Sequence, residues 1–432
     1  MIVTVLSENT KKIKAIRGMN DILPDKSPVW RSLEASIVKI LDQYGYEEIR
    51  IPVMEKTDVF SRTVGESSDI VQKEMYSFED RNSESLTLRP EGTAGCARAV
   101  LEHQLYRSLP LRLWYLGPMF RYERPQRGRH RQFHQVGIES YGLTSPKIDV
   151  EIMQLSARLW RTLGLRNLSL EINSLGTATT RLEYRKVLTD YFSSYYKILD
   201  EDSKKRLKTN PLRILDSKNQ EMSDIILNAP PISDYLDTES AEHFEEIKEL
   251  LSGSGIKFSA NKKLVRGLDY YTKTVFEWKT TELGAQGTIC AGGRYDSLLE
   301  SVGGPSIPAI GLAMGLERLV ELRDIQTESK NIAGPDLYLL ATEEGLDQKV
   351  TRLAETLRDR QTKWSVMVHL GTGSLKSRMK KADRSRATVA IIYGPEEDAK
   401  GEVTIRPLRS TQKQFQCSID QVDQALSDLL KR

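Results

Sequence analysis

The sequence contains little cysteine: its three cysteines, Cys96, Cys290 and Cys417, are far apart and form no C-x-x-C pair. This spacing argues against a disulfide framework and against a zinc site, and it fits a reducing compartment. Among the five histidines, only His130 and His134 lie close together, and neither is expected on a helix. We therefore expect a cytoplasmic protein without a metal site built from its own side chains.

Long apolar runs are also missing, and no stretch approaches the length of a membrane span. The first residues, MIVTVLSENTKK, lack the basic start and the longer hydrophobic segment of a signal peptide. A strong excess of one charge is absent as well, because the formal net charge is only +3. We expect no membrane partner, and any nucleic-acid binding must depend on local basic patches.

Changes of pattern divide the chain into parts. Residues 1–325 mix helices and strands, except that residues from about 177 to 259 are rich in lysine and glutamate and mostly helical. Residues 326–335 are polar and end in Gly-Pro, which predicts a linker. Residues 336–432 alternate strands with helices, which predicts a small α/β sheet. One helix of this part gathers basic residues, either as a solvated face or as a phosphate-binding patch: Lys376, Arg378, Lys380, Lys381, Arg384 and Arg386.

The stretch GPMFRYERPQRGRHRQFHQVGIESYG, residues 117–142, predicts a strand, a basic loop and a second strand. The two strands would hold Arg121, Glu123, Gln135 and Glu139 on a rigid platform. The loop, residues 123–131, carries Arg124, Arg127, Arg129 and Arg131. Arginine forks are planar and permanently charged, so they suit phosphate oxygens. An ordinary solvated, arginine-rich hairpin is the alternative.

Earlier in the chain, a helix expected over 29–44 is followed by a strand expected over 46–53, whose Pro52 favours an edge position. The sequence Arg89-Pro90-Glu91-Gly92-Thr93 then ends a strand and precedes a helix, with Thr93 as the expected N-cap. Glu91 is either a partner of the helix dipole or a carboxylate aimed at a substrate ammonium group.

Three further segments stand out after residue 262. LVRGLDYYTKTVFEW is expected to continue the sheet and contains Arg266, Tyr270 and Tyr271. ICAGGRYD follows, with two glycines that would let the backbone approach a ligand closely. AIGLAMGLERLVELRD predicts a strand, a turn and a helix that presents Arg318.

These motifs together resemble the histidyl-tRNA synthetases. The basic hairpin resembles motif 2 of class II aminoacyl-tRNA synthetases, and the helix, strand and proline of residues 29–53 are similar to motif 1, which forms the dimer interface in that class. GLER is similar to motif 3, although Ala313 stands where the family often has glycine. RPEGT, RGLDYY and AGGRYD resemble signatures typical of the histidyl enzymes. Residues 336–432 resemble the anticodon-binding domain of histidyl, prolyl, threonyl and glycyl synthetases.

The resemblance implies an α/β fold: a class II antiparallel catalytic sheet flanked by helices, a helical insertion and a C-terminal α/β anticodon-binding domain. It implies ligation of L-histidine to tRNA(His) with ATP and Mg²⁺, by a cytoplasmic homodimer. Arg121 and Arg266 would be catalytic. The implied histidine-binding residues are Glu91, Gly92, Thr93, Gln135, Glu139, Arg266, Tyr270 and Tyr271. The implied ATP-binding residues are Arg121, Glu123, Arg129 and Arg318, and the implied tRNA-binding residues are Arg127, Arg129 and Arg131.

Two other functions stay open from the sequence. One is the regulatory subunit of ATP phosphoribosyltransferase, a catalytically silent relative that typically lacks the C-terminal module and parts of the active site. The other is a tRNA-binding protein without ligase activity, which would keep the basic patches but need not keep a histidine pocket. The presence of Glu91, Arg121, Glu139, Arg266 and Arg318 favours the ligase.

Overall fold

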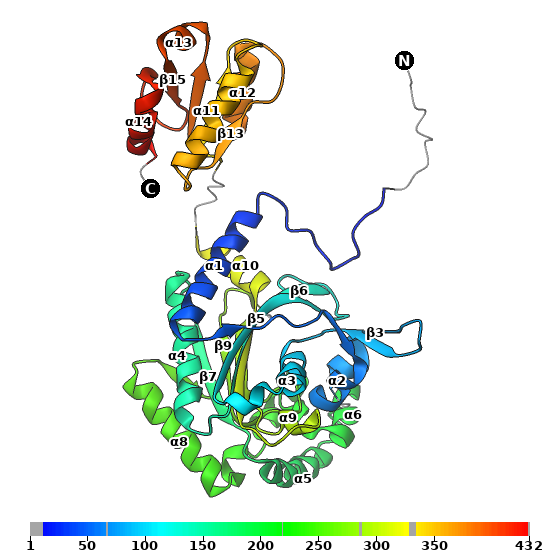
Figure 1. Cartoon of the computed structure of the whole chain (residues 1–432). Helices are drawn as coiled ribbons and strands as arrows, with labels where there is room; N and C mark the ends of the chain where they lie inside the picture. Colours follow the sequence, from blue (N-terminus) through cyan, green and yellow to red (C-terminus); the bar gives the residue numbers. More distant parts are fainter. Residues whose placement is uncertain (1–11, 66–67, 218, 285–286, 328–333, 431–432) are drawn as a thin grey trace. The chain divides into compact units, whose positions relative to one another are not determined.

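The computed structural model describes residues 12–65, 68–217, 219–284, 287–327 and 334–430. The chain divides into two compact units, Met1–Glu328 and Ser329–Arg432, called unit 1 and unit 2 below (Figure 1). The first eleven residues, where a signal peptide is not expected, and residues 328–333 of the expected linker lie outside the described residues. Within the described ranges, no helix is both long enough and apolar enough to cross a membrane.

An eight-stranded sheet forms the centre of unit 1, in the order β1-β5-β6-β11-β10-β9-β7-β8 (Figure 1). The outermost pairs, β1 with β5 and β7 with β8, run parallel, and the pairs between them run antiparallel. The strands are β1 (Glu47–Glu48), β5 (Leu111–Phe120), β6 (Gln132–Tyr141), β7 (Ser169–Ser174), β8 (Phe258–Ala260), β9 (Thr272–Lys279), β10 (Thr288–Arg294) and β11 (Ala309–Gly315). Segments far apart in the sequence thus become neighbours, and the mostly antiparallel α/β fold expected from the sequence is confirmed.

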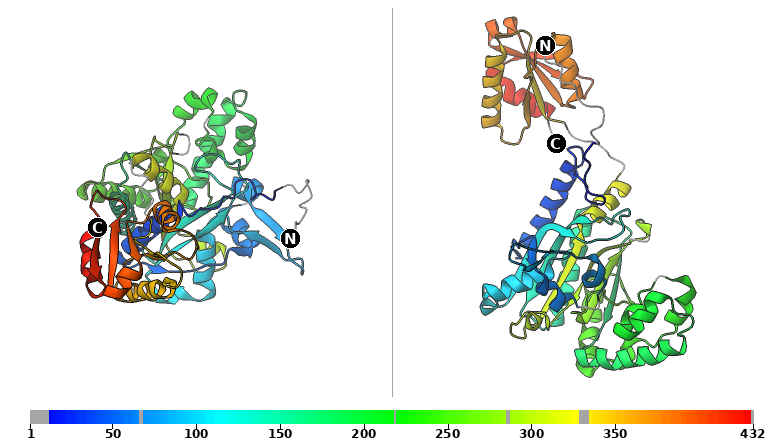
Figure 2. Two further views of the ribbon diagram at one scale, coloured as in Figure 1. Left: turned by 90° about the horizontal axis from the view of Figure 1, so that it is seen from above. Right: turned by 90° about the vertical axis from the view of Figure 1, so that its right-hand side faces the viewer.

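Helices pack on both faces of this sheet (Figures 1 and 2). Side chains alternate along a strand, so Trp114 of β5 joins one apolar cluster and Tyr115 joins the other. The first cluster includes residues of α1 (Ser27–Gln43), α4 (Pro146–Thr162), α8 (Thr238–Gly253) and α10 (Leu316–Gln326). The second includes residues of α3 (Thr93–Glu102), α5 (Ala178–Ser194) and α9 (Leu298–Ser301).

A small sheet, in the order β2-β4-β3, lies in the N-terminal part of unit 1. It consists of β2 (Met54–Lys56), β3 (Tyr76–Glu79) and β4 (Ser85–Leu88), and the helices α2 (Thr57–Val64) and η1 (Ile70–Glu74) precede β3. The strand expected over 46–53 is wrong in extent, because only Glu47–Glu48 pair with the large sheet. Pro52 has no amide hydrogen to donate to a ladder, and the chain leaves the large sheet before joining the small one.

The helices between β7 and β8 gather at one end of unit 1, drawn in green in the right view of Figure 2. They comprise α5, α6 (Glu201–Thr209), η3 (Pro211–Ile214), η4 (Gln220–Met222), α7 (Ser223–Leu227), η5 (Ile232–Tyr235) and α8. The last of them, α8, packs against α4, and its residues Phe244, Ile247 and Leu251 are buried in the first apolar cluster. Helix α8 therefore belongs to the layer that covers the sheet. The elements from α5 to η5 are called the helical module below.

Unit 2 contains a five-stranded sheet in the order β13-β12-β14-β15-β16. Strands β12, β13 and β14 are parallel, and β15 and β16 continue antiparallel. Its elements are β12 (Leu337–Ala341), α11 (Asp347–Arg360), β13 (Val366–Val368), α12 (Leu375–Arg384), β14 (Val389–Tyr393), α13 (Pro395–Lys400), β15 (Glu402–Pro407), β16 (Phe415–Ser418), η7 (Ile419–Gln421) and α14 (Val422–Leu429). Separate apolar clusters lie on its two faces, one shared with α11 and α14 and the other with α12. The small α/β sheet expected from the sequence is confirmed.

Two local expectations are corrected. The stretch from Lys263 is not a strand until β9 begins at Thr272, so Arg266 lies on an irregular segment. Gly293 lies inside β10, where a Cβ atom would come within 2.4 Å of the Thr274 carbonyl oxygen. Close approach of the neighbouring strand, and not of a ligand, explains that glycine.

A buried ion cluster joins β10 to α4 and α8. Arg294 donates to both carboxylate oxygens of Asp149, with Nε–oxygen distances of 3.0 Å and an Nη2–Oδ2 distance of 2.6 Å. It also donates to the carbonyl oxygens of residues 143–145 at 3.0 Å, and His243 Nε2 lies 3.3 Å from Asp149 Oδ1. Burial by itself raises the pKa of Asp149, but the charge of Arg294 and these hydrogen bonds lower it below its usual value.

We predict that Arg294→Met destabilises unit 1 by about 3–5 kcal/mol, because it leaves the Asp149 carboxylate buried without its main partner. Urea unfolding followed by circular dichroism measures the loss. The control is Asp58→Asn, which breaks the exposed pair of Asp58 with Arg62 and should cost about 0.2–1 kcal/mol.

The same cluster predicts an acid dependence. A carboxyl group whose folded pKa is lowered stabilises the protein above its unfolded pKa of about 4, and the stabilisation is lost as the pH falls through the folded pKa. The wild type should therefore lose stability below about pH 4 more steeply than Asp149→Asn does. For the preceding prediction, an equal loss of unfolding free energy in Arg294→Met and in Asp58→Asn would contradict a stabilising role of the Arg294–Asp149 pair.

Candidate active site

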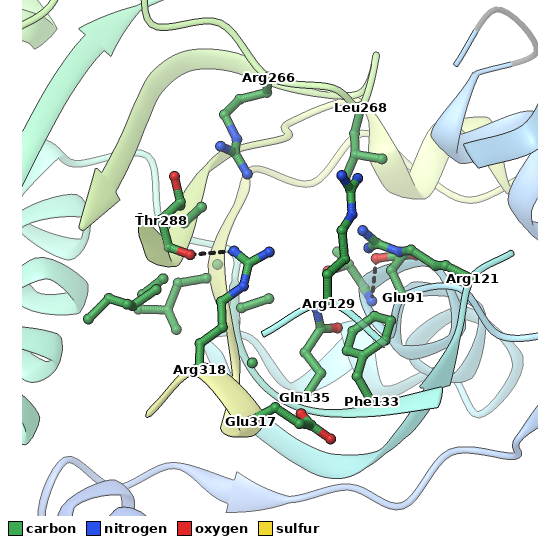
Figure 3. Close-up of a pocket in the computed structure, with 18 of the residues that line it drawn as sticks. Glu91, Arg121, Arg129, Phe133, Gln135, Arg266, Leu268, Thr288, Glu317 and Arg318 are labelled. Atoms are coloured by element: carbon green, nitrogen blue, oxygen red, sulfur yellow. Dashed lines mark hydrogen bonds between the residues drawn. The ribbon is translucent and has the colours of Figure 1, made fainter. Parts of the chain in front are cut away.

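A single cavity on the large sheet collects most of the residues singled out in the sequence (Figure 3). It lies over the ends of β5 and β6, over β10 and β11, and against the irregular segment before β9. The expected site residues that line it are Glu91, Thr93, Arg121, Glu123, Arg129, Gln135, Arg266, Tyr270, Tyr271 and Arg318. Residues more than 200 positions apart in the sequence therefore share one site.

Arginine side chains dominate this cavity. Arg121 follows directly after β5, donates from Nε to the Pro90 carbonyl oxygen at 2.8 Å, and lies over the ring of Phe133. Arg318, in the first turn of α10, donates from Nε to the Gly128 carbonyl oxygen at 3.1 Å and also to the Thr288 carbonyl oxygen. These three contacts to uncharged carbonyl oxygens fix the directions of the two guanidinium groups without neutralising their charge.

The arginines affect one another. Burial, together with the positive charges of Arg129 and Arg121, lowers the pKa of Arg318 to about 10. Burial also lowers the pKa values of Arg121 and Arg129. Arg266 behaves differently: burial opposes its charge, but an ion pair with Glu277 and the nearby tyrosines raise its pKa. A site that crowds cations in this way is prepared for an anion with several charges.

Glu91 lies at the N-terminus of α3. Its two carboxylate oxygens accept the backbone N–H groups of Thr93 and Ala94, each at 2.8 Å. Burial raises its pKa, against the effect of these amides and of Arg121. Thr93 was expected to be the N-cap, but that expectation is wrong: Gly92 is the N-cap, and Glu91 satisfies the amides that a capping side chain would take.

Glu139 does not line the cavity but lies directly beneath it, fully buried in β6. Three hydroxyl groups donate to it: Thr93 at 2.8 Å and Tyr115 at 2.9 Å to Oε1, and Tyr295 to Oε2. Burial raises its pKa well above the usual value. Gly311 on β11 faces it, where a Cβ atom would come within 2.1 Å of Oε2. Glycine is therefore required beside this carboxylate.

Tyrosine rings form the wall above Glu139. The ring centroids of Tyr270 and Tyr271 are 4.7 Å apart, and that of Tyr295 lies 5.5 Å from Tyr270 and 6.2 Å from Tyr271. The guanidinium carbon of Arg266 lies 5.6 Å from the Tyr271 ring centroid. This wall offers flat apolar surface together with hydroxyl groups, which suits a small, partly aromatic ligand.

The arginines of the basic loop after β5 lie in different environments. Arg129 lines the cavity and pairs with Glu123. Arg127 pairs instead with Glu321 of α10 on the surface, and Arg131 lies over the ring of Tyr122, with 3.9 Å between its guanidinium carbon and the ring centroid. Among the residues expected to bind tRNA, the structure therefore places only Arg129 beside the cavity.

Several residues of the site were not expected from the sequence. Tyr115, Tyr295 and Glu277 hold Glu139 and Arg266, and Glu317 accepts the backbone N–H of His134 and so ties α10 to β6. Tyr295 belongs to the AGGRYD segment and Glu277 to the LVRGLDYYTKTVFEW segment, so both had a signal in the sequence, whereas Tyr115 lies outside the motifs. No group of three or more potential metal ligands occurs among the described side chains.

The basic helix expected in unit 2 is α12, and one of its residues must be removed from the proposed phosphate-binding patch. Arg378 is buried, with 2% of its surface exposed. It donates to the carbonyl oxygens of Gly373 and Ala341 at 2.9 and 3.0 Å and to Asp347 at 3.2 Å. Arg378 therefore fixes the start of α12 within the unit and is not available to a phosphate.

Solved structures resemble the whole chain. The apo histidyl-tRNA synthetase of S. aureus is 33% identical, with a TM-score of 0.80 over 96% of this chain and 100% of that chain. The histidyl-tRNA synthetase of Nostoc sp. PCC 7120 is 18% identical, with a TM-score of 0.72 over 97% of this chain and 100% of that chain. A Bacillus halodurans protein, described as an ATP phosphoribosyltransferase regulatory subunit/histidyl-tRNA synthetase, is 22% identical, with a TM-score of 0.65 over 89% of this chain and 99% of that chain. Because of their low identity, the last two matches show the fold alone.

Family models agree with these structures and cover both units. A model described as histidyl-tRNA synthetase matches residues 18–319, and a model described as an anticodon binding domain matches residues 336–429. The resemblance seen in the sequence is confirmed. The chain belongs to the histidyl-tRNA synthetase family of class II aminoacyl-tRNA synthetases and contains an anticodon-binding domain.

Proposed function

We propose that this chain is a cytoplasmic histidine–tRNA ligase that joins L-histidine to tRNA(His) with ATP. One observation carries the proposal: Arg121, Arg266 and Arg318 converge on one cavity with Glu91 and Gln135, directly above the buried Glu139. This arrangement places groups suited to a polyphosphate next to groups suited to a small amino acid with a polar ring.

In the first step, a carboxylate oxygen of histidine attacks the α-phosphorus of ATP and pyrophosphate leaves. Two anions must meet, so the site has to supply fixed positive charge and orientation. We assign Arg121 and Arg266 to opposite sides of the α-phosphate and Arg318 to the γ-phosphate. Arg129 would contact the outer phosphates and Glu123 would lie near the adenine. No base is required, because the attacking carboxylate is ionised at neutral pH.

Magnesium would accompany ATP and offset charge on the β- and γ-phosphate oxygens. The carboxylates around the cavity are already engaged: Glu91 with backbone amides, Glu123 with Arg129, and Glu317 with His134. Magnesium bound to a nucleotide is held mainly by phosphate oxygens and water, with one or two carboxylates. The residues present fit an ion that arrives with the substrate, and we assign it no cage of protein ligands.

Recognition of histidine would use the deeper half of the cavity. We assign the ammonium group to Glu91, Gly92, Thr93 and Gln135. Glu139 and Tyr271 would pair with the two ring nitrogens, and Tyr270 would line the pocket. A buried acceptor that loses its partner costs about 1–3 kcal/mol, so an apolar ligand of the same size would be rejected.

In the second step, the histidyl group moves to the terminal adenosine of tRNA(His). We propose a catalytic domain over 1–325 with a helical insertion at about 177–259, a linker over 326–335 and an anticodon-binding domain over 336–432. The basic loop, with Arg127, Arg129 and Arg131, would contact the acceptor end. Assembly as a homodimer is proposed from the likeness of residues 29–53 to motif 1.

A catalytically silent regulatory subunit is the rival function within the family. Such relatives typically lack the anticodon-binding module and part of the site, whereas this chain matches an anticodon-binding model over residues 336–429. Histidine-dependent ATP–pyrophosphate exchange separates the two functions. We expect exchange that needs histidine, and its absence in the folded protein would remove the ligase proposal.

Arg266→Lys should reduce the rate constant of this exchange by at least ~100-fold while the KM for ATP changes less than about twofold. A point charge cannot reproduce the planar fork that the α-phosphate needs as charge builds in the transition state. The control is Lys262→Ala, an exposed cation on the same segment, which should behave as the wild type. Equal losses in the rate constant and in ATP affinity would contradict the catalytic assignment.

Glu139→Ala should lower kcat/KM for histidine by about one to two powers of ten, because a buried partner of the ligand is lost. Discrimination against glutamine and asparagine should fall with it. Tyr115→Phe, which removes one of the hydroxyl groups that hold Glu139, should show a smaller loss. Exchange kinetics with each amino acid measure both effects, and an unchanged dependence on histidine in Glu139→Ala would refute the assignment.

A further inference from the structure

The segment that carries Arg266, Tyr270 and Tyr271 is irregular and does not hold itself in place. It runs from residue 261 to residue 271 between β8 and β9. Within the segment, Leu264 N donates to the Asn261 carbonyl oxygen and Lys263 N to Asn261 Oδ1, both near its start, and further contacts come from elsewhere in unit 1. Irregular backbone away from a ladder needs such partners to stay in one conformation.

Asp269, one residue before Tyr270, makes three of these external contacts. Its backbone N–H donates to the Val64 carbonyl oxygen at 3.2 Å, at the end of α2. Its carbonyl oxygen accepts from Arg181 Nη1 at 2.9 Å, and its Oδ1 accepts from Asn210 Nδ2 at 2.8 Å. Arg181 belongs to α5 and Asn210 follows α6, so the helical module holds the segment at this residue.

Residues that follow α2 also hold Asp269 and the helical module close together. Gly65 adopts a positive φ of 96°, and a Cβ atom there would come within 2.3 Å of Asp269 Oδ2. Four residues later, Asp69 pairs with Arg206 at 3.3 Å and with Arg213, both in the helical module. Burial raises the pKa of Asp69, but these arginines lower it overall. The module is therefore anchored to the core next to the segment that it contacts.

We propose that Arg181 and Asn210 are positioning residues for histidine activation, and that they act through Asp269 on Arg266 and Tyr271. Neither residue lines the cavity, so neither touches the reacting groups. A displacement of a catalytic group by ~1 Å can lower the reaction rate about 100-fold. The helical module thereby controls the adenylation step itself, before any tRNA binds. This inference rests on the proposed ligase function.

The test uses Asn210→Ala and Arg181→Met in the full chain, without tRNA. We expect the rate constant of histidine-dependent pyrophosphate exchange to fall by about tenfold or more, with the KM for ATP unchanged within about twofold. The amount of adenylate formed in the first turnover should still equal the amount of enzyme, because the site is intact but misaligned. Controls remove an amide and a cationic group from exposed positions of the same module: Asn228→Ala and Lys186→Met should exchange as the wild type does.

The outcomes separate the two levels of the proposal. No exchange by the wild type would overturn the ligase function. Exchange by the wild type together with unchanged rates in both variants would overturn only the positioning role. A reduced amount of first-turnover adenylate at a normal rate per active site would show loss of folded enzyme and would also overturn it. Should Arg181→Met fail to fold, Asn210→Ala, which removes one amide, decides the question.

Discussion

Crowding of positive charge in a partly closed cavity is the constraint on which the rest of the site depends. Burial lowers the pKa values of Arg121, Arg129 and Arg318, neighbouring arginines lower them further, and Glu277 offsets the charge of Arg266. Cations held this close repel one another, so the surrounding fold has to keep them in place. Contacts to carbonyl oxygens, such as that of Arg121 to Pro90, direct the guanidinium groups and leave their charge for a ligand. The cavity therefore favours the binding of a ligand that carries several negative charges.

The large sheet makes this arrangement possible. Antiparallel pairing of β6 with β11, of β11 with β10 and of β10 with β9 makes neighbours of strands from four motif segments. Beneath the cavity, the hydroxyl groups of Thr93, Tyr115 and Tyr295 satisfy a carboxylate that would otherwise be costly to bury. Behind it, Arg294 and Asp149 connect the end of β10 to α4, next to Tyr295. Tyr295 directly follows Arg294, so the end of β10 carries both the buried ion pair with α4 and the hydroxyl group that donates to Glu139.

Residues 261–271 carry part of the cavity but belong to no strand of the sheet, so ladder hydrogen bonds do not hold them. Here the position of Arg266 depends on its ion pair with Glu277 of β9, on side chains of the helical module and on the end of α2. A module that contacts this segment through Asp269 can therefore affect the cavity residues Arg266, Tyr270 and Tyr271. The inferred role of Arg181 and Asn210 links this module to the candidate active site.

The sequence by itself determined the order of the elements and the motif residues, because strand periodicity and the short motifs are local properties. It predicted the basic hairpin of β5 and β6, the Arg318 helix and the α/β pattern of unit 2, and all are confirmed as elements of the fold. Only the tertiary structure decided the pairing of Tyr115 and Tyr295 with Glu139, the packing of α8 on α4, the burial of Arg378 and the irregular path around Arg266. These features depend on contacts between residues distant in the chain, and no local pattern encodes which distant partner a side chain will meet.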